Sequence, residues 1–230
     1  MSDRDCAVQA AVLARLGFSA YDLPTRDKIP LIRELMAPLG AGLALDVGIG
    51  TGYTTYSIFG DRPTVCVDLH APNLAYYRER VTAVPGARRP LCVVAEATAL
   101  PFKADVFRFA LCSEVLEHLE DDGAAVAELG RVLGPRGKAV LTVPYTGIGF
   151  TSFLELCGIR TVHDFPGPEH HVRPGYDERA LGRLLESRGL AVERQAYCLR
   201  VFTRLVVDGV SLAHLLYQRI VHGRRAWTWS

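Results

Sequence analysis

The sequence predicts an α/β fold: a doubly wound, mostly parallel, Rossmann-like sheet with helices on both faces and a helical or loop lid. Short apolar runs rich in β-branched residues alternate with helical patterns along the chain. These runs are almost continuously apolar, which is typical of strands covered on both faces. A glycine-rich turn follows the first run directly, where sheets of this kind bind their ligands.

Five strands are predicted, at 43–47, 64–67, 91–95, 107–112 and 138–143. Helices are predicted at 5–16, 26–39, 72–84, 123–133 and 177–188, followed by a sixth strand at 190–199 and a helical tail. We expect the 230 residues to form a single domain, since that length can bury one full core. Its expected parts are N-terminal helices (1–41), a cofactor-binding core (42–144), a substrate lid (145–175) and a C-terminal helix, strand and tail (176–230).

Composition narrows the class of protein and its location. A formal net charge of +1 gives no electrostatic reason to expect a nucleic-acid partner. The N-terminus, "MSDRDCAVQAAVLARLGF", is acidic and amphipathic, unlike a signal peptide, and no apolar stretch reaches the ~20 residues of a membrane span. The six cysteines form no C-x-x-C pair and are expected to be reduced thiols. We therefore predict a cytoplasmic protein.

The stretch "LDVGIGTGYTT" holds three glycines at every second position, Gly48, Gly50 and Gly52. A dinucleotide fingerprint would require its third glycine at position 53, which is Tyr53, and a P-loop would require a following Gly-Lys-Ser/Thr. Neither a pyrophosphate nor a triphosphate is therefore expected. The glycines still allow a ligand to touch the backbone, because no Cβ intervenes.

Two carboxylates follow the next strands. Asp68 lies 22 residues after Asp46, where a strand-end carboxylate can accept both hydroxyls of a ribose. Glu96 ends the third strand and could accept from an adenine amino group. Leu69 and Ala97 could enclose the adenine ring between them. The pattern indicates an adenosine ligand.

Five motifs in this order resemble those of class I S-adenosylmethionine-dependent methyltransferases, most of all the small-molecule, type 11 branch that includes quinone-pathway enzymes: "LALDVGIGTG", "VCVDLH", "AEATALPF", "LCSEVLEHLEDD" and "LGRVLGPRGKAVLTVP". The resemblance implies that S-adenosylmethionine is the cofactor. It further implies that Asp46 and residues 48–52 hold the methionine part, that Asp68 holds the ribose, and that Glu96 with Ala97 faces the adenine. Tyr53 and Ser113 are also expected to contact the cofactor. Position 96 departs from the family pattern, which usually has aspartate there.

The resemblance implies an enzyme that transfers a methyl group to O, N or C of a small, lipophilic or aromatic acceptor by in-line displacement. His118 is the predicted base, because its ordinary pKa range suits proton removal, and His170 or His171 in the lid is the alternative. Two other functions stay open: a protein that binds the cofactor without catalysis, and a macromolecular methyltransferase.

Glu114, Glu117 and His118 form E-x-x-E-H, and this spacing would place them on one face of a helix. Two carboxylates and an imidazole can bind a divalent metal, with a fourth ligand from His163, His170 or His171 in the lid. The spacing alone supports this set, so we predict catalysis without a metal and keep the metal as the alternative.

The tail after residue 199 mixes leucines and valines with arginines. We expect it to pack on the domain, while peripheral membrane contact or a homodimer interface stays open. The predicted partner is a small-molecule acceptor, with no nucleic acid.

Overall fold

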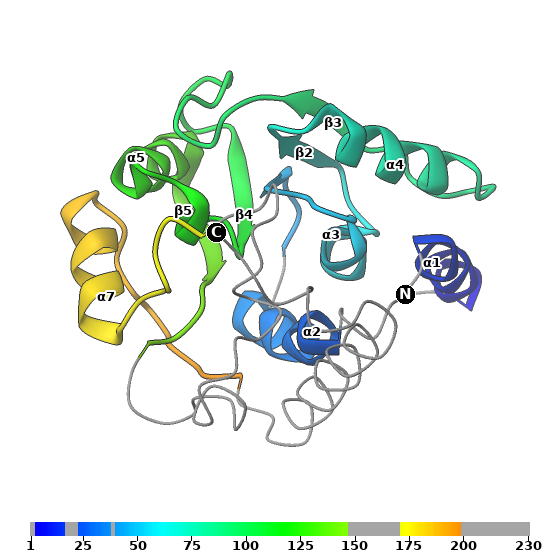
Figure 1. The fold of residues 1–230 in the computed structure, drawn as a ribbon. Helices are drawn as coiled ribbons and strands as arrows, with labels where there is room; N and C mark the ends of the chain where they lie inside the picture. Colours follow the sequence, from blue (N-terminus) through cyan, green and yellow to red (C-terminus); the bar gives the residue numbers. More distant parts are fainter. Residues whose placement is uncertain (1–2, 17–22, 38–39, 147–170, 199–230) are drawn as a thin grey trace, which may run out of the picture.

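The computed structural model describes residues 3–16, 23–37, 40–146 and 171–198, and it confirms the predicted parallel sheet (Figure 1). The sheet has the strand order β3-β2-β1-β4-β5, and each neighbouring pair is parallel. Its strands are β1 (Ala44–Val47), β2 (Thr64–Asp68), β3 (Leu91–Val94), β4 (Phe107–Ser113) and β5 (Leu133–Thr142). The order reverses between β1 and β4, and sheets of this kind bind ligands beyond the carboxyl ends of the strands at such a switch point.

Helices connect the strands and cover both faces. They are α1 (Asp3–Leu16), α2 (Leu23–Met36), α3 (Tyr53–Phe59), α4 (Ala71–Thr82), the 3₁₀ turn η2 (Leu116–His118), α5 (Asp122–Val132) and α7 (Glu178–Ser187). Aspartates cap the last two helices: Asp121 accepts from the backbone N–H of Ala124 at 2.8 Å, and Asp177 accepts from that of Ala180 at 2.7 Å. These bonds satisfy N–H groups that have no partner within the helix.

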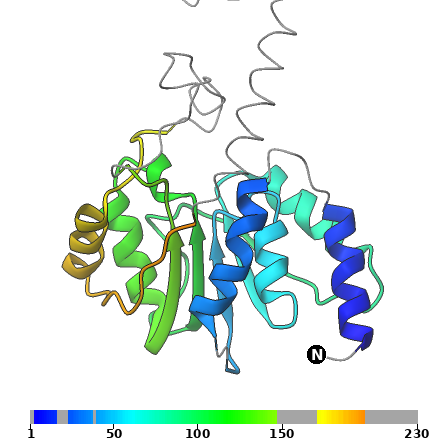
Figure 2. The ribbon, with the colours of Figure 1, turned by 90° about the horizontal axis from the view of Figure 1, so that it is seen from below.

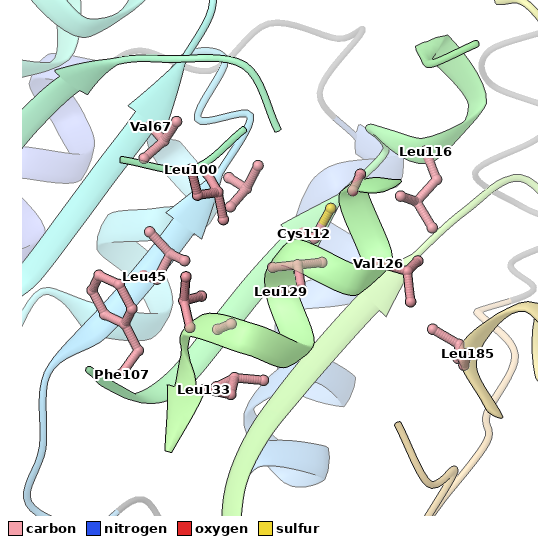
Figure 3. Packing of buried hydrophobic residues seen from close by; sticks show 14 of the residues in the cluster. Leu45, Val67, Leu100, Phe107, Cys112, Leu116, Val126, Leu129, Leu133 and Leu185 are labelled. Atoms are coloured by element: carbon pink, nitrogen blue, oxygen red, sulfur yellow. The ribbon is translucent and has the colours of Figure 1, made fainter. Parts of the chain in front are cut away.

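Alternate strand residues divide the core between the two faces. Leu45, Val47, Val65 and Val67 belong to one buried cluster with Val126 and Leu129 of α5. Figure 3 shows Leu45 and Val67 of the strands beside Val126 and Leu129 of the helix. The opposite face packs against α2 and α3 through Ile32, Ile58 and Phe109, and against α1 and α4 through Val12 and Leu74. In Figure 2, α2, α3 and α1 lie side by side along the sheet. Burial on both faces explains why β1, β2 and most of β4 are almost continuously apolar, whereas the edge strand β3 is partly exposed.

The prediction of a sixth strand was wrong for the residues that the structure describes. Residues 190–198 contain no strand. Residues 191–198 are exposed, so no buried face fixes a register for them. Side-chain ion pairs hold this segment instead, from Glu193 to Lys138 at 2.7 Å and from Arg194 to Glu34 at 2.8 Å.

The fifth strand begins earlier than predicted. Leu133 already pairs with Phe107, and the register then shifts so that Lys138 pairs with Phe109. The "GPRG" residues between them form the bulge, and Arg136 there has a φ of 60°. Of the described cysteines, Cys66 and Cys112 are buried, Cys92 is half-buried and Cys6 is exposed. The predicted tail helix, Cys157 and residues 147–170 of the lid, with His163 and His170, lie outside the described residues.

Candidate cofactor and acceptor site

The glycine loop between β1 and α3 has a left-handed backbone at all three glycines, with φ values of 77°, 52° and 76° for Gly48, Gly50 and Gly52. A Cβ on Gly48 would overlap a methyl group of Val115, and a Cβ on Gly52 would overlap the ring of Tyr77. A Cβ on Gly50 would meet no atom within 4 Å. The outer two glycines therefore permit internal packing, and Gly50 alone of the three turns toward open space.

The carboxylate of Asp68 ties this loop to the end of β2. It accepts hydrogen bonds from the backbone N–H of Gly50 at 3.2 Å and of His70 at 2.8 Å, and the side-chain amide of Asn73 donates to both of its oxygens at 3.3 Å. The side chain is 7% exposed. A carboxylate offers about four acceptor positions, and these four hydrogen bonds occupy them in this structure.

Asp46 lies inside β1 and is buried. The hydroxyl of Thr55 in α3 donates a hydrogen bond to its carboxylate. The pKa of Asp46 is raised to about 7, mainly because the side chain is buried; the Thr55 hydrogen bond opposes this rise and the charge of Asp68 adds to it. The negative charge on Asp46 is thus easily lost at neutral pH, and a cationic group near it would favour the ionised form.

The residues expected around the adenine lie at the neighbouring strand ends. Leu69 is 59% exposed, an unusual position for a large apolar side chain directly after a buried strand. The pairing of Asp68 with Val94 places Ala97 and Glu96 shortly beyond the end of β3 at the same edge of the sheet. Glu96 is exposed and accepts from the hydroxyl of Thr98 at 3.3 Å.

Two hydroxyl side chains are linked by a hydrogen bond at the end of β4. The Oγ of Ser113 lies 2.8 Å from the Oγ1 of Thr142, which donates to the Oε1 of Glu114 at 2.8 Å. Since one hydroxyl has one proton, Ser113 is the donor to Thr142. The ammonium of Lys28, from α2, lies 3.1 Å from the same Glu114 oxygen. Glu114 itself has a φ of 56°, so the chain turns sharply there.

The prediction that Glu114, Glu117 and His118 share one helix face was wrong. Only residues 116–118 are helical, in a single 3₁₀ turn, and Glu114 precedes it. Glu117 is 0% exposed, and neither of its carboxylate oxygens has a hydrogen-bond partner. Burial raises the pKa of Glu117 to about 8, helped by the nearby charge of Glu114 and opposed by Lys28 and Arg173.

The segment after the lid brings His171 to this turn. The His118 and His171 rings lie edge to face, with centroids 4.5 Å apart and an interplanar angle of 83°. The backbone N–H groups of Val172 and Arg173 donate to the carbonyl of Glu117, at 2.9 and 3.2 Å. One ligand atom of His118, one of His171 and one of Glu117 all lie within 4.8 Å of one another.

Arg173 holds the His171 segment against the turn, and the sequence analysis did not predict this role. Its guanidinium donates to the carbonyls of Leu116 at 2.8 Å and Glu120 at 3.1 Å, and it forms an ion pair with Asp122 at 2.9 Å. Arg173 follows the turn by more than fifty residues, so no local spacing could have indicated the contact. Lys28, which reaches Glu114 from before the first strand, was missed for the same reason.

Comparison with known proteins identifies the segment that carries this site. Residues 45–141 match the family model described as "Methyltransferase domain". This match assigns residues 45–141, rather than the whole chain, to a methyltransferase domain. The domain includes the glycine loop, Asp68, Glu96 and the turn at 113–118. The predicted class I S-adenosylmethionine-dependent family, with its transferase class and its cofactor, is therefore confirmed for this domain.

Two curated relatives each match about half of the chain. A malonyl-[acyl-carrier protein] O-methyltransferase from Halorhodospira halophila is 33% identical over 126 residues, 54% of this chain and 37% of the relative. A ubiquinone/menaquinone biosynthesis C-methyltransferase from Geobacter sulfurreducens is 32% identical over 104 residues, 44% of this chain and 41% of the relative. The matched regions span about two fifths of each relative's length.

Solved structures support the fold over a longer stretch. The [4+2]-cyclase SpnF superposes with a TM-score of 0.65 at 18% identity, covering 87% of this chain and 71% of that one. A SAM-dependent methyltransferase from Aquifex aeolicus gives 0.53 at 19% identity, covering 77% and 92%. At such identities the likeness concerns the fold alone. Among the described residues, no helix is both long and apolar enough to cross a membrane.

Proposed function

We propose that this chain binds S-adenosylmethionine and transfers its methyl group to a small-molecule acceptor held between the glycine loop and the turn at 113–118. Transfer from a sulfonium is an in-line displacement, and the protein contributes mainly alignment and the exclusion of water. The acceptor carbon, nitrogen or oxygen attacks the methyl carbon, and the sulfur leaves with the electron pair of the broken bond.

The observation that carries this proposal is the combination of Gly50 and Asp68 at the switch point of the sheet. The Gly50 position is open, its backbone N–H donates to Asp68, and Asp68 ends the neighbouring strand. This arrangement supports an adenosine at the end of β2 and an amino-acid tail along the loop. The exposed Leu69 adds an apolar surface for the adenine.

The acceptor is proposed as small, and lipophilic or aromatic. The names of the two curated relatives point to an acyl-carrier-protein malonyl group for one and quinone biosynthesis for the other, and they specify O- and C-methylation respectively. For this chain we leave the acceptor atom open among O, N and C. A chain with the fold need not transfer methyl groups, since one structural neighbour is named as a cyclase.

Calorimetric titration with S-adenosylmethionine and S-adenosylhomocysteine tests the cofactor. Asp68→Ala should weaken binding by about 1.5–3 kcal/mol, on the order of 10- to 100-fold, because the ribose hydroxyls lose a charged acceptor. Asp61→Ala is the matched control, since Asp61 is an exposed aspartate paired with Arg62. Unchanged affinity in Asp68→Ala would refute the ribose assignment, and a preference for NAD would refute the cofactor.

Methyl transfer is tested with labelled S-adenosylmethionine against phenols, quinone precursors, lipids and acyl carrier protein. Incorporation of label into at least one acceptor is expected. Tight cofactor binding with no transfer to any acceptor would instead favour a protein that binds the cofactor without catalysis. The cytoplasmic location and a homodimer stay predictions.

A further inference from the structure

Glu117 is the one buried side chain with unsatisfied polar atoms among the residues that the structure describes. Both carboxylate oxygens are inaccessible and lack a hydrogen-bond partner, and the side chain is 0% exposed. A buried carboxylate normally has a paired cation or several donors, because losing its hydration is costly. Glu117 therefore points to a positively charged group that completes its surroundings.

The nearby cationic side chains are engaged elsewhere. The Lys28 ammonium pairs with Glu114 at 3.1 Å, and the Arg173 guanidinium pairs with Asp122 at 2.9 Å. Arg173 also donates to two backbone carbonyls, so its direction is fixed. Among the described residues, neither of these two cations pairs with Glu117, and a bound cation would fill that role.

Two imidazoles lie beside the Glu117 carboxylate. One ligand atom from each of Glu117, His118 and His171 can be chosen so that all three lie within 4.8 Å of one another. His118 comes from the turn after β4, and His171 arrives from the segment that follows the lid. Two neighbouring residues of the turn and one residue from a distant segment thus lie close together.

We propose that Glu117, His118 and His171 bind a Zn²⁺ ion or a similar divalent transition-metal ion, and that its open coordination position takes an oxygen atom of the methyl acceptor. Two imidazoles and one carboxylate are a ligand set that such ions favour, and three protein ligands leave a fourth position for substrate. Mg²⁺ prefers oxygen ligands and is a poorer match. This set differs from the E-x-x-E-H alternative, because His171 takes the place of Glu114.

The fold fixes the position of the His171 segment relative to the turn. The backbone N–H groups of Val172 and Arg173 donate to the carbonyl of Glu117, and this clamps the segment carrying His171 onto the turn. Val115 of the same turn packs so closely on Gly48 that no Cβ fits between them. The ion would therefore lie beside the cofactor loop, at the switch point between β1 and β4.

The role of the ion rests on the proposed methyl transfer. An acceptor hydroxyl bound to the cation loses its proton to solvent more readily, because the cation stabilises the resulting oxyanion. The oxygen then forms its bond to the methyl carbon as the carbon–sulfur bond breaks and the sulfur keeps the electron pair. The products are the methyl ether, S-adenosylhomocysteine and one released proton. The inferred acceptor class is a molecule that presents a hydroxyl or enol oxygen.

Metal binding is tested on the whole chain, without a polyhistidine tag and after treatment with a chelator. Titration with ZnCl₂ should show one equivalent bound, and CoCl₂ should give the visible absorption of a coordinated ion. Glu117→Gln and His171→Ala should each weaken Zn²⁺ binding by about 100-fold or more, since each removes one of three ligands. Glu120→Gln, three residues on and exposed, is the matched control and should bind Zn²⁺ like the wild type.

Three results would overturn the ligand set: no binding of either ion, unchanged Zn²⁺ affinity in His171→Ala, or equal affinity for Mg²⁺. Glu114→Gln separates the two candidate sets, because Glu114 is held by Lys28 and Thr142 and should matter less than tenfold. A loss as large as that of Glu117→Gln would assign the ion to Glu114 instead. If Glu117→Gln misfolds because Glu117 is buried, His171→Ala still tests the ligand set, since His171 is only half-buried.

A separate titration with S-adenosylhomocysteine distinguishes this inference from the proposed function. The metal-free chain should still bind it, because no proposed ligand is a cofactor contact. Loss of cofactor binding in both forms would refute the proposed function and leave the metal site standing. Zn²⁺ binding by a chain whose methyl transfer is indifferent to chelator would refute the role of the ion in acceptor binding.

Discussion

The glycine loop at 48–52 and the turn at 113–118 face each other across the switch point of the sheet. They differ in whether the rest of the protein supplies partners for their buried polar groups. In the loop, Val115 and Tyr77 fill the space beside Gly48 and Gly52, and Asp68 accepts from the Gly50 backbone. In the turn, Glu117 is buried with both oxygens unpartnered.

The difference separates a surface that is preformed from one that needs a further group. A loop with its polar groups satisfied keeps its shape before the ligand arrives, which lowers the cost of binding. A buried carboxylate without a partner costs stability in the free protein, and a ligand that satisfies it recovers that cost. The loop is thus preformed for the proposed cofactor, whereas the proposed metal ion would complete the turn.

The largest expected effect contrasts two glycines of the loop. Gly52→Val should lower the free energy of unfolding by about 3–5 kcal/mol, because the side chain overlaps Tyr77 and a β-branched residue resists a positive φ. Gly50→Val should cost only about 1–2 kcal/mol, since that position is open, yet it should abolish cofactor binding. Urea denaturation and calorimetry measure the two effects. Equal loss of stability in both variants would mean that the loop is not packed as described.

The second prediction concerns the buried Asp46, whose pKa is raised from 3.8 to about 7. The folded protein binds the Asp46 proton more tightly than the unfolded chain does. The resulting contribution to the free energy of unfolding is complete below pH ~4 and is lost as the pH rises to about 7. The loss amounts to about 4 kcal/mol at most. Asp46→Asn, which stays neutral and can still accept from Thr55, should remove this part of the pH dependence.

Denaturation of the ligand-free protein between pH 4 and 8 measures this pH dependence of the free energy of unfolding. The difference between wild type and variant isolates Asp46, because other titrating groups are common to both. Asp61→Asn, at an exposed position, should reproduce the wild-type slope. A slope that survives in Asp46→Asn would show that this carboxylate is ionised in the folded protein.

The third prediction concerns the clamp on the turn. Arg173→Ala removes hydrogen bonds to the Leu116 and Glu120 carbonyls and leaves Asp122 without its ion-pair partner. We expect a loss of about 2–3 kcal/mol in stability, together with faster hydrogen exchange at the Val172 amide. Arg179→Ala, at an exposed position in α7, should change neither. Unchanged exchange at Val172 would show that the backbone bonds hold the segment without Arg173.

The smallest expected effect concerns the ion pair between Lys28 and Glu114, at the start of the turn. Lys28→Met breaks a half-exposed ion pair with Glu114 and should cost about 0.5–1 kcal/mol, less at high salt. Lys138→Met, whose pair with Glu193 is more exposed, should cost at most about 0.5 kcal/mol. A cost for Lys28→Met as large as that for Arg173→Ala would mean that the turn is held from both sides.

The order of elements was predictable because local signals specify it. Five apolar runs with turn residues between them placed all five strands to within a few residues, apart from the early start of β5 at Leu133. The predicted sixth strand failed because apolar content says nothing about whether a partner edge and a buried face are available. Residues 191–198 have neither a ladder nor a buried face in the described structure.

The sequence by itself determined the parallel sheet, the glycine loop and the strand-end carboxylates, since each of these depends on residues that are neighbours in the chain. The tertiary structure decided which glycine is open, and it showed that Glu114 stands outside the helical turn. It also brought His171 and Arg173 to Glu117 and Lys28 to Glu114. These contacts join residues separated by more than fifty positions, and burial and charge pairing at such distances follow from packing, which no local pattern encodes.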